Sequence, residues 1–475
     1  MASDRFPTVL AQSAAVRDGD ESAESLTEAA LARIAELDPD LNAFVSLRAD
    51  AALADARELD TEQRSGSLRG PLHGVPIAIK DENDVAGLPT AYGGASATTP
   101  AAADSEVVRL LRAAGAVVVG KTHMPEFGIW PFTETEANGL TRNPWDLSRS
   151  PAGSSGGTAA AVASGMVAMG IGGDGGGSIR LPASWCGLVG LKPTRGRVSA
   201  APHPDLWRAL GTLGPLTHTV ADTALVYDVL AGTTPTDRFS APRWGTTLTE
   251  AIEAGVQRAL RICVALDNPT VGPRADAETV AAVESAADTL SALGHTVVRH
   301  EPSYPNVTVP FALQMTGGIG DEAHRVEHPR ALERRTRQLA AIGRGLGAGP
   351  LGRWAERTGA RAGDEFDTAF FDGPEAFDLL LTPTTPFPAV PAGQLTGAGL
   401  VTALRRAAPM ASYTGLWNVL GNPAASLPWG FSGDGLPLAV QLIARNGGEP
   451  LLVSICSDLE RRRPDAGRTP ELPRA

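Results

Sequence analysis

Residues 149–196 read RSPAGSSGGTAAAVASGMVAMGIGGDGGGSIRLPASWCGLVGLKPTRG and hold two serine–glycine clusters, one around Ser154 and one around Ser178. Glycines beside a serine let backbone N–H groups approach a reacting carbonyl, which is what an oxyanion hole requires. Either cluster alone is explained more simply as a tight turn with solvated serines. Because the apolar, strand-like segment GVPIAIKD precedes them at 74–81, the combination indicates a catalytic centre.

Lysine is the rarest basic residue of this chain. The sequence has 41 lysines and arginines, and only Lys80, Lys121 and Lys192 are lysines. Arginine keeps its proton in proteins, whereas a buried lysine can lose it and act as a base. A GC-rich genome would explain the scarcity, but not why all three lysines lie in one part of the chain. We therefore expect at least one of them to be catalytic.

Apolar strand-like segments alternate with amphipathic segments. Residues 24–61 predict two helices, since apolar residues recur three and four positions apart. Strands are predicted at 74–81 and 116–119, and a helix of small residues at 158–164. Further strands are predicted in RICVALD, HTVVRHEP, DLLLTPTTPFPA and PLAVQLIA, and further helices at 275–293, in the Arg-rich stretch up to 361, and at 449–461. Such alternation favours an α/β fold with a buried sheet.

The composition of the chain argues against two classes of partner, nucleic acids and membranes. The chain has 475 residues, 43% of them hydrophobic, and a net charge of -12. Without a Lys/Arg-rich stripe or a run of 18 apolar residues, we expect neither a nucleic-acid partner nor a membrane span. The scattered Cys186, Cys263 and Cys456 indicate a reducing compartment, and hence the cytoplasm. We predict no metal site, and we expect His324 and His328 on a solvated helix face.

The arrangement resembles the amidase signature family. The resemblance rests on GVPIAIKDENDVAG, GKTHMPEFG, AGSSGGTAAAVASG, GGDGGGSIRLPASWCGLVGLKPT and NVLGNPAASLPWGFSGDGLPLAVQLIA. It implies the α/β amidase signature fold, a large central mixed β-sheet covered by α-helices on both faces. It also implies a hydrolase that cleaves carbon–nitrogen bonds of amides without a cofactor. Small or aryl amides are the expected substrates, and carbamates (urethanes) and aryl esters plausible ones.

The same resemblance predicts a single amidase domain in four stretches. Residues 1–70 would form a helical segment packed on the core, and 71–240 the core with the catalytic triad. Residues 241–375 would be a variable middle excursion, within which the Gly-rich GRGLGAGPLGRW at 343–354 is a candidate flexible segment. Residues 376–475 would complete the core.

Catalytic roles follow from the resemblance position by position. Ser178 would attack the acyl carbon and carry the acyl-enzyme. Ser154, after a cis Gly153–Ser154 peptide bond, would relay protons to Lys80, a neutral base. Lys121 and Lys192 would be structural. The oxyanion hole would be formed by the N–H groups of Gly175, Gly176, Gly177 and Ser178.

We also expect roles for several residues around this triad. Asp174 and Arg180 would form an ion pair that fixes the nucleophile loop. Ser155 and Thr158 would either support the relay or cap the following helix, and capping is favoured. Cys186 is expected to be buried. The substrate pocket is expected to include Phe127, Ile129, Trp130, Tyr413 and Trp417.

Four positions depart from the family pattern. His123 stands where asparagine is usual, and Ala152, the first residue of AGSSGG, stands where glycine is usual. Gly173 stands where a β-branched residue is common, and Gly175 where a larger residue is common. The triad is intact, and we expect the extra glycines of the nucleophile loop to alter the width of the acyl pocket or the rigidity of the loop.

Other readings of the sequence remain open. GSSGG fits G-x-S-x-G and would make Ser155 the nucleophile of an α/β-hydrolase, but the preceding NPWDLSRSPA is not a strand. GIGGDG fits a dinucleotide motif, but no helix is predicted after it. The main alternative is the A subunit of a tRNA-dependent glutamine amidotransferase, which would share the triad. We expect a monomer or homodimer acting on a small-molecule amide or carbamate.

Overall fold

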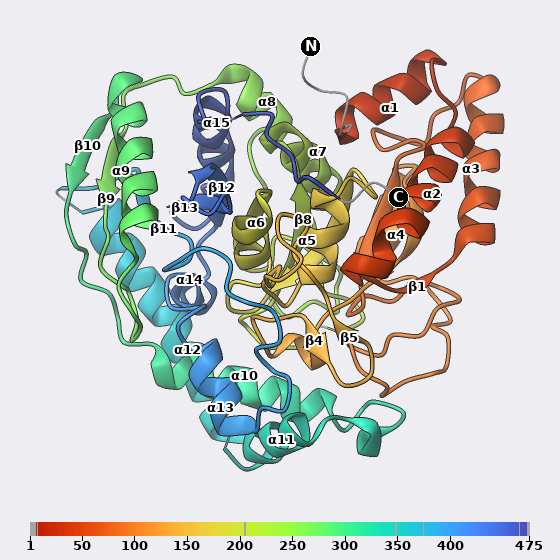
Figure 1. The fold of residues 1–475 in the computed structure, drawn as a ribbon. Coiled ribbons are helices and arrows are strands. Elements are labelled where there is room, and N and C mark those ends of the chain that lie inside the picture. The colour runs from red at the N-terminus through yellow and green to blue at the C-terminus, as the bar shows by residue number, and fades with distance from the viewer. Residues whose placement is uncertain are drawn as a thin grey trace.

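A sheet of eleven strands runs through the computed structural model, which describes residues 6, 8–203, 206–346, 349–373, 375–464 and 466–472 (Figure 1). Its strand order is β1-β3-β2-β6-β8-β7-β12-β13-β11-β9-β10. The sheet is mixed: β3, β2 and β6 run parallel, as do β11, β9 and β10, and the other neighbours are antiparallel. The strands are β1 (Phe44–Leu47), β2 (Pro76–Lys80), β3 (Val117–Thr122), β6 (Met169–Asp174), β7 (Val189–Lys192), β8 (Thr212–Thr217), β9 (Arg261–Val264), β10 (Thr296–Arg299), β11 (Leu379–Pro383), β12 (Ala424–Phe431) and β13 (Pro437–Ile443).

Helices cover both faces of this sheet because its side chains are apolar on both sides. On β11, Leu379 and Leu381 join the core of one face, and Leu380, pointing the opposite way, joins the core of the other. The first face is covered by α4 (Glu106–Ala113), α7 (Val220–Leu230), α8 (Leu248–Ala254), α9 (Ala277–Ala292) and α15 (Glu449–Glu460). The second is covered by α2 (Ala23–Leu41), α3 (Ala49–Arg64), α5 (Gly156–Ala163), α6 (Arg180–Cys186) and α14 (Gly415–Leu420). The predicted fold class is confirmed.

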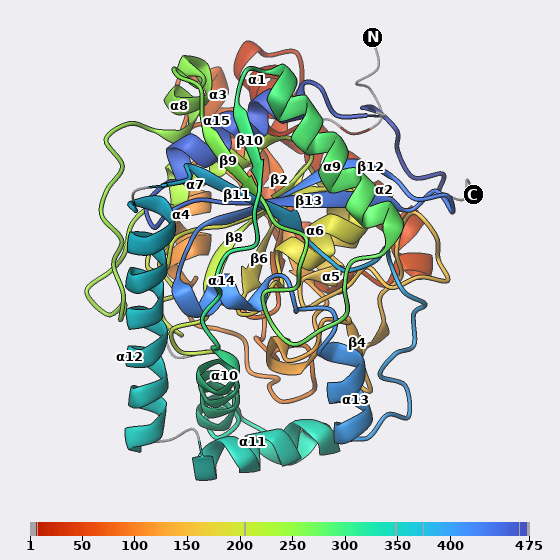
Figure 2. The same ribbon diagram turned by 90° about the vertical axis from the view of Figure 1, so that its left-hand side faces the viewer.

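Four helices gather at one end of the molecule, below the sheet in Figures 1 and 2. They are α10 (Thr308–Glu322), α11 (Arg334–Leu346), α12 (Gly349–Phe366) and α13 (Leu400–Ala407). The prediction that 241–375 is an excursion from the core is wrong for its first half, because β9 and β10 complete the sheet and α9 packs on it. Only α10 to α12 leave the sheet. Most of the glycine-rich 343–354 is helical; Gly347 and Ala348 lie outside the described residues.

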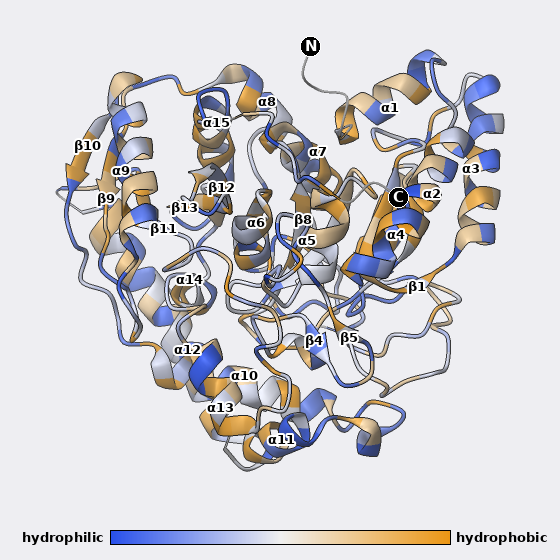
Figure 3. Cartoon of the chain, in the orientation of Figure 1, coloured by the Kyte–Doolittle hydropathy of each residue, from blue (hydrophilic) through white to orange (hydrophobic). Residues whose placement is uncertain are grey.

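The remaining elements are short or peripheral. They are α1 (Val9–Asp18), the strand pair β4 (Glu134–Thr135) and β5 (Gly139–Leu140), the 3-10 turns Glu126–Gly128 and Pro329–Ala331, and a π-helical turn at Asp367–Phe371. Outer helices such as α3 alternate hydrophilic and hydrophobic residues along the ribbon, as expected of helices with one face in solvent (Figure 3). No helix among the described residues is long and apolar enough to cross a membrane.

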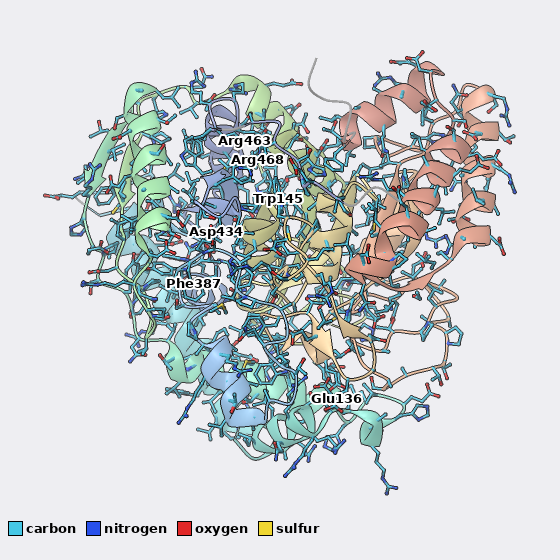
Figure 4. All side chains as sticks on the ribbon, in the orientation of Figure 1. Glu136, Trp145, Phe387, Asp434, Arg463 and Arg468 are labelled. Carbon is cyan, nitrogen blue, oxygen red and sulfur yellow. The ribbon has the colours of Figure 1, made fainter. Side chains whose placement is uncertain are left out.

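The segment after α15 returns across the molecule and packs on an aromatic pair. Arg468 lies over the ring of Phe431 at 4.3 Å, and the Trp145 ring packs on the same Phe431 at 5.0 Å. Figure 4 shows Arg468 and Trp145 one above the other in front of the core. This contact attaches the C-terminal segment to the loop that precedes Ser154. The three cysteines are buried and unpaired.

Candidate active site

Three side chains from separate elements meet at one cavity. Lys80 ends β2, Ser154 lies two residues before the start of α5, and Ser178 follows β6 in the glycine loop. Because β2 and β6 are parallel neighbours, with Ile79 paired to Ile171, the ends of the two strands lie at the same edge of the sheet. Lys80, Ser154 and Ser178 all line this cavity.

Hydrogen bonds connect the Lys80 amine to Ser154 and to the end of β6. Lys80 Nζ donates to Ser154 Oγ at 2.8 Å and to the Gly173 carbonyl at 3.3 Å. The Gly153–Ser154 peptide bond is cis, as expected. Lys80 and Ser154 are 1% exposed and Ser178 is 8% exposed, so the residue predicted to attack is the one most open to a ligand.

Ser154 is held close to Gly128, at a position that requires glycine. Gly128 has φ +69°, and a Cβ there would lie 2.9 Å from Ser154 Oγ. A side chain at Gly153 would meet the backbone N of Phe132 at 2.7 Å. The relay serine therefore depends on two close backbone approaches that only glycine permits.

Burial controls the proton affinity of Lys80. Desolvation lowers the pKa of Lys80 from its ordinary value, whereas the nearby carboxylates of Glu82 and Asp174 raise it. The other two lysines have different environments. Lys121 pairs with Asp81 at 2.7 Å, and Lys192 Nζ donates to the carbonyl of the neighbouring proline. Neither is among the described residues that line the cavity.

The nucleophile loop is fixed by the predicted ion pair of Asp174 and Arg180. Both are fully buried, and Arg180 Nε donates to Asp174 Oδ2 at 2.9 Å. Burial opposes the charged form of Asp174, but the charge and hydrogen bonds of Arg180, together with Asn418, outweigh it and hold the pKa of Asp174 below its ordinary value. Arg180 also donates to the Thr414 carbonyl, which ties the loop to the segment before α14.

Four backbone N–H groups follow Asp174, and three of them are free. Among the described residues, the N–H groups of Gly175, Gly176 and Ser178 meet no acceptor in hydrogen-bonding geometry. The Gly177 N–H donates to Asp174 Oδ1 at 2.7 Å. The expectation that Gly177 supplies an oxyanion donor is therefore wrong in this structure, since a carboxylate already accepts its proton.

Ser155 and Thr158 do not cap the helix that follows them. Ser155 occupies the N-cap position of α5, but its hydroxyl bonds the N–H and the carbonyl of Gly173 at 3.3 Å each. Thr158 Oγ1 lies 2.7 Å from Thr122 Oγ1. The favoured capping role is wrong. Both hydroxyls instead connect α5 to neighbouring strands of the sheet, and Ser155 bonds the residue that also accepts from Lys80.

An apolar cavity of about 170 Å³ opens beside Ser178 and Gly176. Two predicted pocket residues, Ile129 and Trp130, line it. Residues missed by sequence reasoning complete its wall: Leu181, Trp207, Phe311, Met315, Leu404, Ala407, Ala408 and Ala411. They come from separate segments, so no local sequence signal groups them.

The other three predicted pocket residues belong to the core. The Phe127 side chain is fully buried and lines neither cavity at Ser178. Tyr413 donates its hydroxyl to the Leu266 carbonyl at 2.9 Å, and Trp417 donates its ring N–H to the Tyr413 carbonyl at 3.0 Å. Their polar atoms are satisfied by backbone, so the aromatic character of these residues serves packing. The pocket expectation is wrong for Phe127, Tyr413 and Trp417.

The departures from the family pattern have local explanations. A Cβ at Gly175 would lie 2.5 Å from the Trp207 ring, and a Cβ at Gly173 would lie 2.0 Å from Glu82 Oε1. His123 is buried, with its ring nitrogens 2.9 and 3.2 Å from two threonine hydroxyls, and burial lowers its pKa to about 4. Each glycine thus makes room for a larger side chain that lines the active-site cavity.

No group of three or more His, Cys, Asp or Glu residues with metal-binding geometry occurs in the described part of the chain. His324 and His328 are exposed, as expected, but they follow the end of α10 at Glu322 and do not share a helix face. The nucleophile of an α/β-hydrolase directly follows a strand. Among the described residues, the segment directly before Ser155 contains no strand, so the structure does not support Ser155 as such a nucleophile.

Known proteins resemble this chain over nearly its whole length. The Amidase family model matches residues 25–453. The Mycobacterium bovis protein AmiB2, a putative amidase by name, is 41% identical over 472 residues, which cover 98% of this chain and 98% of AmiB2. The A subunit of the glutamyl-tRNA(Gln) amidotransferase of Prochlorococcus marinus is 37% identical over 484 residues, which cover 93% of this chain and 94% of that protein. The structure of 6-aminohexanoate cyclic dimer hydrolase complexed with substrate matches with a TM-score of 0.90 at 31% identity and covers 98% of this chain and 99% of that chain.

Proposed function

The chain belongs to the amidase signature family of hydrolases that act on amides, and we propose that it is a stand-alone serine amidohydrolase with Ser178 as nucleophile. The observation that carries this proposal is the buried Lys80–Ser154 hydrogen bond of 2.8 Å at a cavity that Ser178 also lines. A serine needs a neighbouring base to become a nucleophile, and a desolvated lysine reached through a second hydroxyl can supply one.

In the acylation step that we propose, the proton of the nucleophile moves through Ser154 to Lys80. Ser178 Oγ attacks the carbonyl carbon of the substrate while its proton passes to Ser154 Oγ, and the Ser154 proton passes to the neutral Lys80 amine. The carbonyl oxygen becomes an oxyanion that the free N–H groups of Gly175, Gly176 and Ser178 can bind. One such donor is worth roughly 3–4 kcal/mol in the transition state.

The leaving group departs by the reverse proton path. Lys80 returns its proton through Ser154 to the amine nitrogen, the carbon–nitrogen bond breaks, and the acyl group stays on Ser178 Oγ. A water molecule then loses a proton to the same relay, attacks the ester and releases the acid. Because the relay can protonate an amine, it does not exclude the easier leaving groups of carbamates and aryl esters.

The size and lining of the apolar cavity support a small aryl or aliphatic group on the substrate. A volume of about 170 Å³ is close to that of an apolar cavity of roughly 150 Å³ that holds one benzene ring. Among the residues that the structure describes, no charged side chain lines this cavity. That lining favours the hydrolase over a glutaminase subunit, since the α-ammonium and carboxylate of glutamine need charged or polar partners. The three buried, unpaired cysteines fit a reducing compartment, and we propose a cytoplasmic location.

A substrate panel on the purified chain tests the proposal. The panel contains 4-nitroacetanilide, an aryl carbamate, a nitrophenyl ester and glutamine, with Ser178→Ala as the blank. We expect release of the aromatic product from the first three that depends on Ser178, and losses of several orders of magnitude for Ser154→Ala and Lys80→Ala. Glutamine turnover alone, and only with an added partner subunit, would favour the amidotransferase reading.

Two variants examine the roles of individual groups. Lys80→Arg keeps the charge but cannot act as a neutral base, so we expect it to be inactive although folded. Ser155→Ala serves as the matched serine control and should retain far more activity than Ser154→Ala. Near-normal turnover by Lys80→Arg would contradict the base role, and a lethal Ser155→Ala with an active Ser178→Ala would restore the α/β-hydrolase reading.

A further inference from the structure

Glu82 is a buried carboxylate in the active-site cavity that the relay described above does not use. It lies two residues after Lys80, is 9% exposed and lines the same cavity as Ser154 and Ser178. Its Oε1 atom is 3.3 Å from Lys80 Nζ, yet it accepts no well-aligned hydrogen bond. A carboxylate oxygen that is buried without a hydrogen bond is costly, and it calls for a function.

The absence of a side chain at Gly173 leaves space for the Glu82 carboxylate. A Cβ at Gly173 would lie 2.0 Å from Glu82 Oε1 and 3.2 Å from Oε2, and the three nearest heavy atoms to it all belong to the Glu82 carboxylate. The Gly173 carbonyl also accepts from Lys80. Gly173 and Glu82 therefore form a matched pair around the amine of Lys80.

The other charged groups near Lys80 are already paired. Asp174 is bound by Arg180 at 2.9 Å, and Asp81 by Lys121 at 2.7 Å. The remaining charged or titratable groups that line the cavity are also engaged: Arg208 pairs with Asp321 at 2.9 Å, and His203 lies 2.9 Å from Asp84. Among the described residues, Glu82 is the carboxylate that faces Lys80 without a competing cation.

The number of acceptors around Nζ matches the protonated amine. A lysine ammonium has three N–H donors, whereas a neutral amine has two and a lone pair. Nζ has three oxygens within 3.3 Å: it donates to Ser154 Oγ and to the Gly173 carbonyl, and Glu82 Oε1 is the third, close enough to accept after a small rotation. In the neutral state the lone pair can face Ser154 while the two donors face the other oxygens. When Lys80 takes the proton from Ser154, no group has to move.

We propose that Glu82 is a positioning residue that stabilises the Lys80 ammonium formed during acylation and so sets the pH range of the reaction. This inference rests on the proposed function of Lys80 as the base. Glu82 acts through Lys80, whose Nζ lies 3.3 Å from Glu82 Oε1, and Gly173 leaves room for its carboxylate.

The pH dependence of turnover tests this role. Glu82→Gln keeps the size of the side chain but removes its charge, so Lys80 holds its proton less tightly. Since the neutral amine is the active form, the acid limb of the kcat/KM profile should move to lower pH, by about one to three units for the loss of an opposite charge at this distance. We expect kcat to fall at least tenfold, because the weaker base drives acylation less well. A purely structural residue would lower activity without moving the limb.

Gly173→Ala provides an independent test. The added methyl group displaces the carboxylate, so this variant should shift the acid limb in the same direction as Glu82→Gln. In a Glu82→Ala background the same Gly173→Ala change should cost little, because the atoms it would meet are gone. Thermal unfolding will show whether Glu82→Gln folds. If it does not, the two Gly173→Ala variants still test the role of Glu82.

The outcomes separate this inference from the proposed function. If Ser178-dependent turnover is present but neither Glu82→Gln nor Gly173→Ala moves the acid limb, the role of Glu82 is refuted and the proposed hydrolase stands. If Gly173→Ala is equally damaging with and without Glu82, the proposed pair is refuted. Loss of Ser178 dependence would overturn the proposed function itself.

Discussion

Replacing Asp174 with asparagine leaves the shape of the side chain intact but removes the charge that Arg180 faces. Asp174 Oδ2 accepts from the Ile179 N–H at 3.2 Å and from Arg180 Nε at 2.9 Å. Its Oδ1 accepts from the Gly177 N–H at 2.7 Å, from Arg180 Nη2 at 3.0 Å and from Asn418 Nδ2 at 2.9 Å. An asparagine turns one of these oxygens into an NH₂ group, so in either orientation at least two buried donors lose their acceptor.

The expected loss of stability follows from these contacts. Two unsatisfied buried donors cost about 1–3 kcal/mol each, and breaking a buried ion pair costs about 3–5 kcal/mol because one charge stays behind. Both figures describe the same event, so we expect the free energy of unfolding of Asp174→Asn to fall by about 3–5 kcal/mol. Turnover should fall as well, since Gly177 and Ile179 flank the nucleophile and lose part of their anchor.

Urea unfolding followed by fluorescence of the eight tryptophans measures this loss. The matched control is Glu365→Gln, which removes the partner of Arg361 from an exposed pair of 2.7 Å in which Glu365 is 63% exposed. Exposed pairs of this kind contribute little, because solvent screens both charges. If Asp174→Asn shifts the unfolding free energy no more than this control does, the reasoning from the buried charge is refuted.

Three further changes probe stability, the relay and the pocket. Burial raises the pKa of Glu126 from 4.5 to about 7. The neutral side chain therefore stabilises the folded state fully below pH 4.5, and this stability is lost as the pH rises through 7. In urea unfolding at pH 8, Glu126→Gln should be more stable than the parent by about 1–3 kcal/mol. A stability difference that does not change between pH 4 and pH 8 would contradict this. Gly128→Ala should reduce kcat by at least about tenfold, because its Cβ would lie 2.9 Å from Ser154 Oγ at a left-handed φ; an unchanged kcat would show that the relay tolerates displacement. Ala407→Phe should raise KM for aryl acyl substrates by about tenfold or more while sparing acetyl substrates, since Ala407 lines the apolar cavity; an equal effect on both would remove that cavity from substrate binding.

The fold class could be predicted because it depends on features that are local in sequence, and the three triad positions could be proposed because their motifs resemble those of the amidase signature family. Alternating apolar segments specify strands and helices, and the glycine clusters mark where the backbone must approach closely. Predicted boundaries are less accurate where polar residues are buried. The sequence predicts a strand that ends at Val119, but β3 continues to Thr122, because Lys121 is neutralised by Asp81 inside the structure.

The walls of the site could not be predicted because they depend on packing between distant segments. Trp207 and Phe311 reach the cavity only through the tertiary fold. Tyr413 and Trp417 look like pocket residues in sequence, yet backbone carbonyls satisfy their polar atoms within the core. Likewise, no sequence pattern reveals that the Gly177 N–H is already taken by Asp174.

The glycines at 173 and 175 limit which side chains can be exchanged between this chain and its relatives. A Cβ at 175 would lie 2.5 Å from the Trp207 ring, and a Cβ at 173 would lie 2.0 Å from Glu82 Oε1. A side chain at either position therefore requires its neighbour to shift. Because the indole ring is rigid whereas the end of the glutamate side chain can swing aside, we expect the Trp207 pair to tolerate the exchange of one member less well than the Glu82 pair.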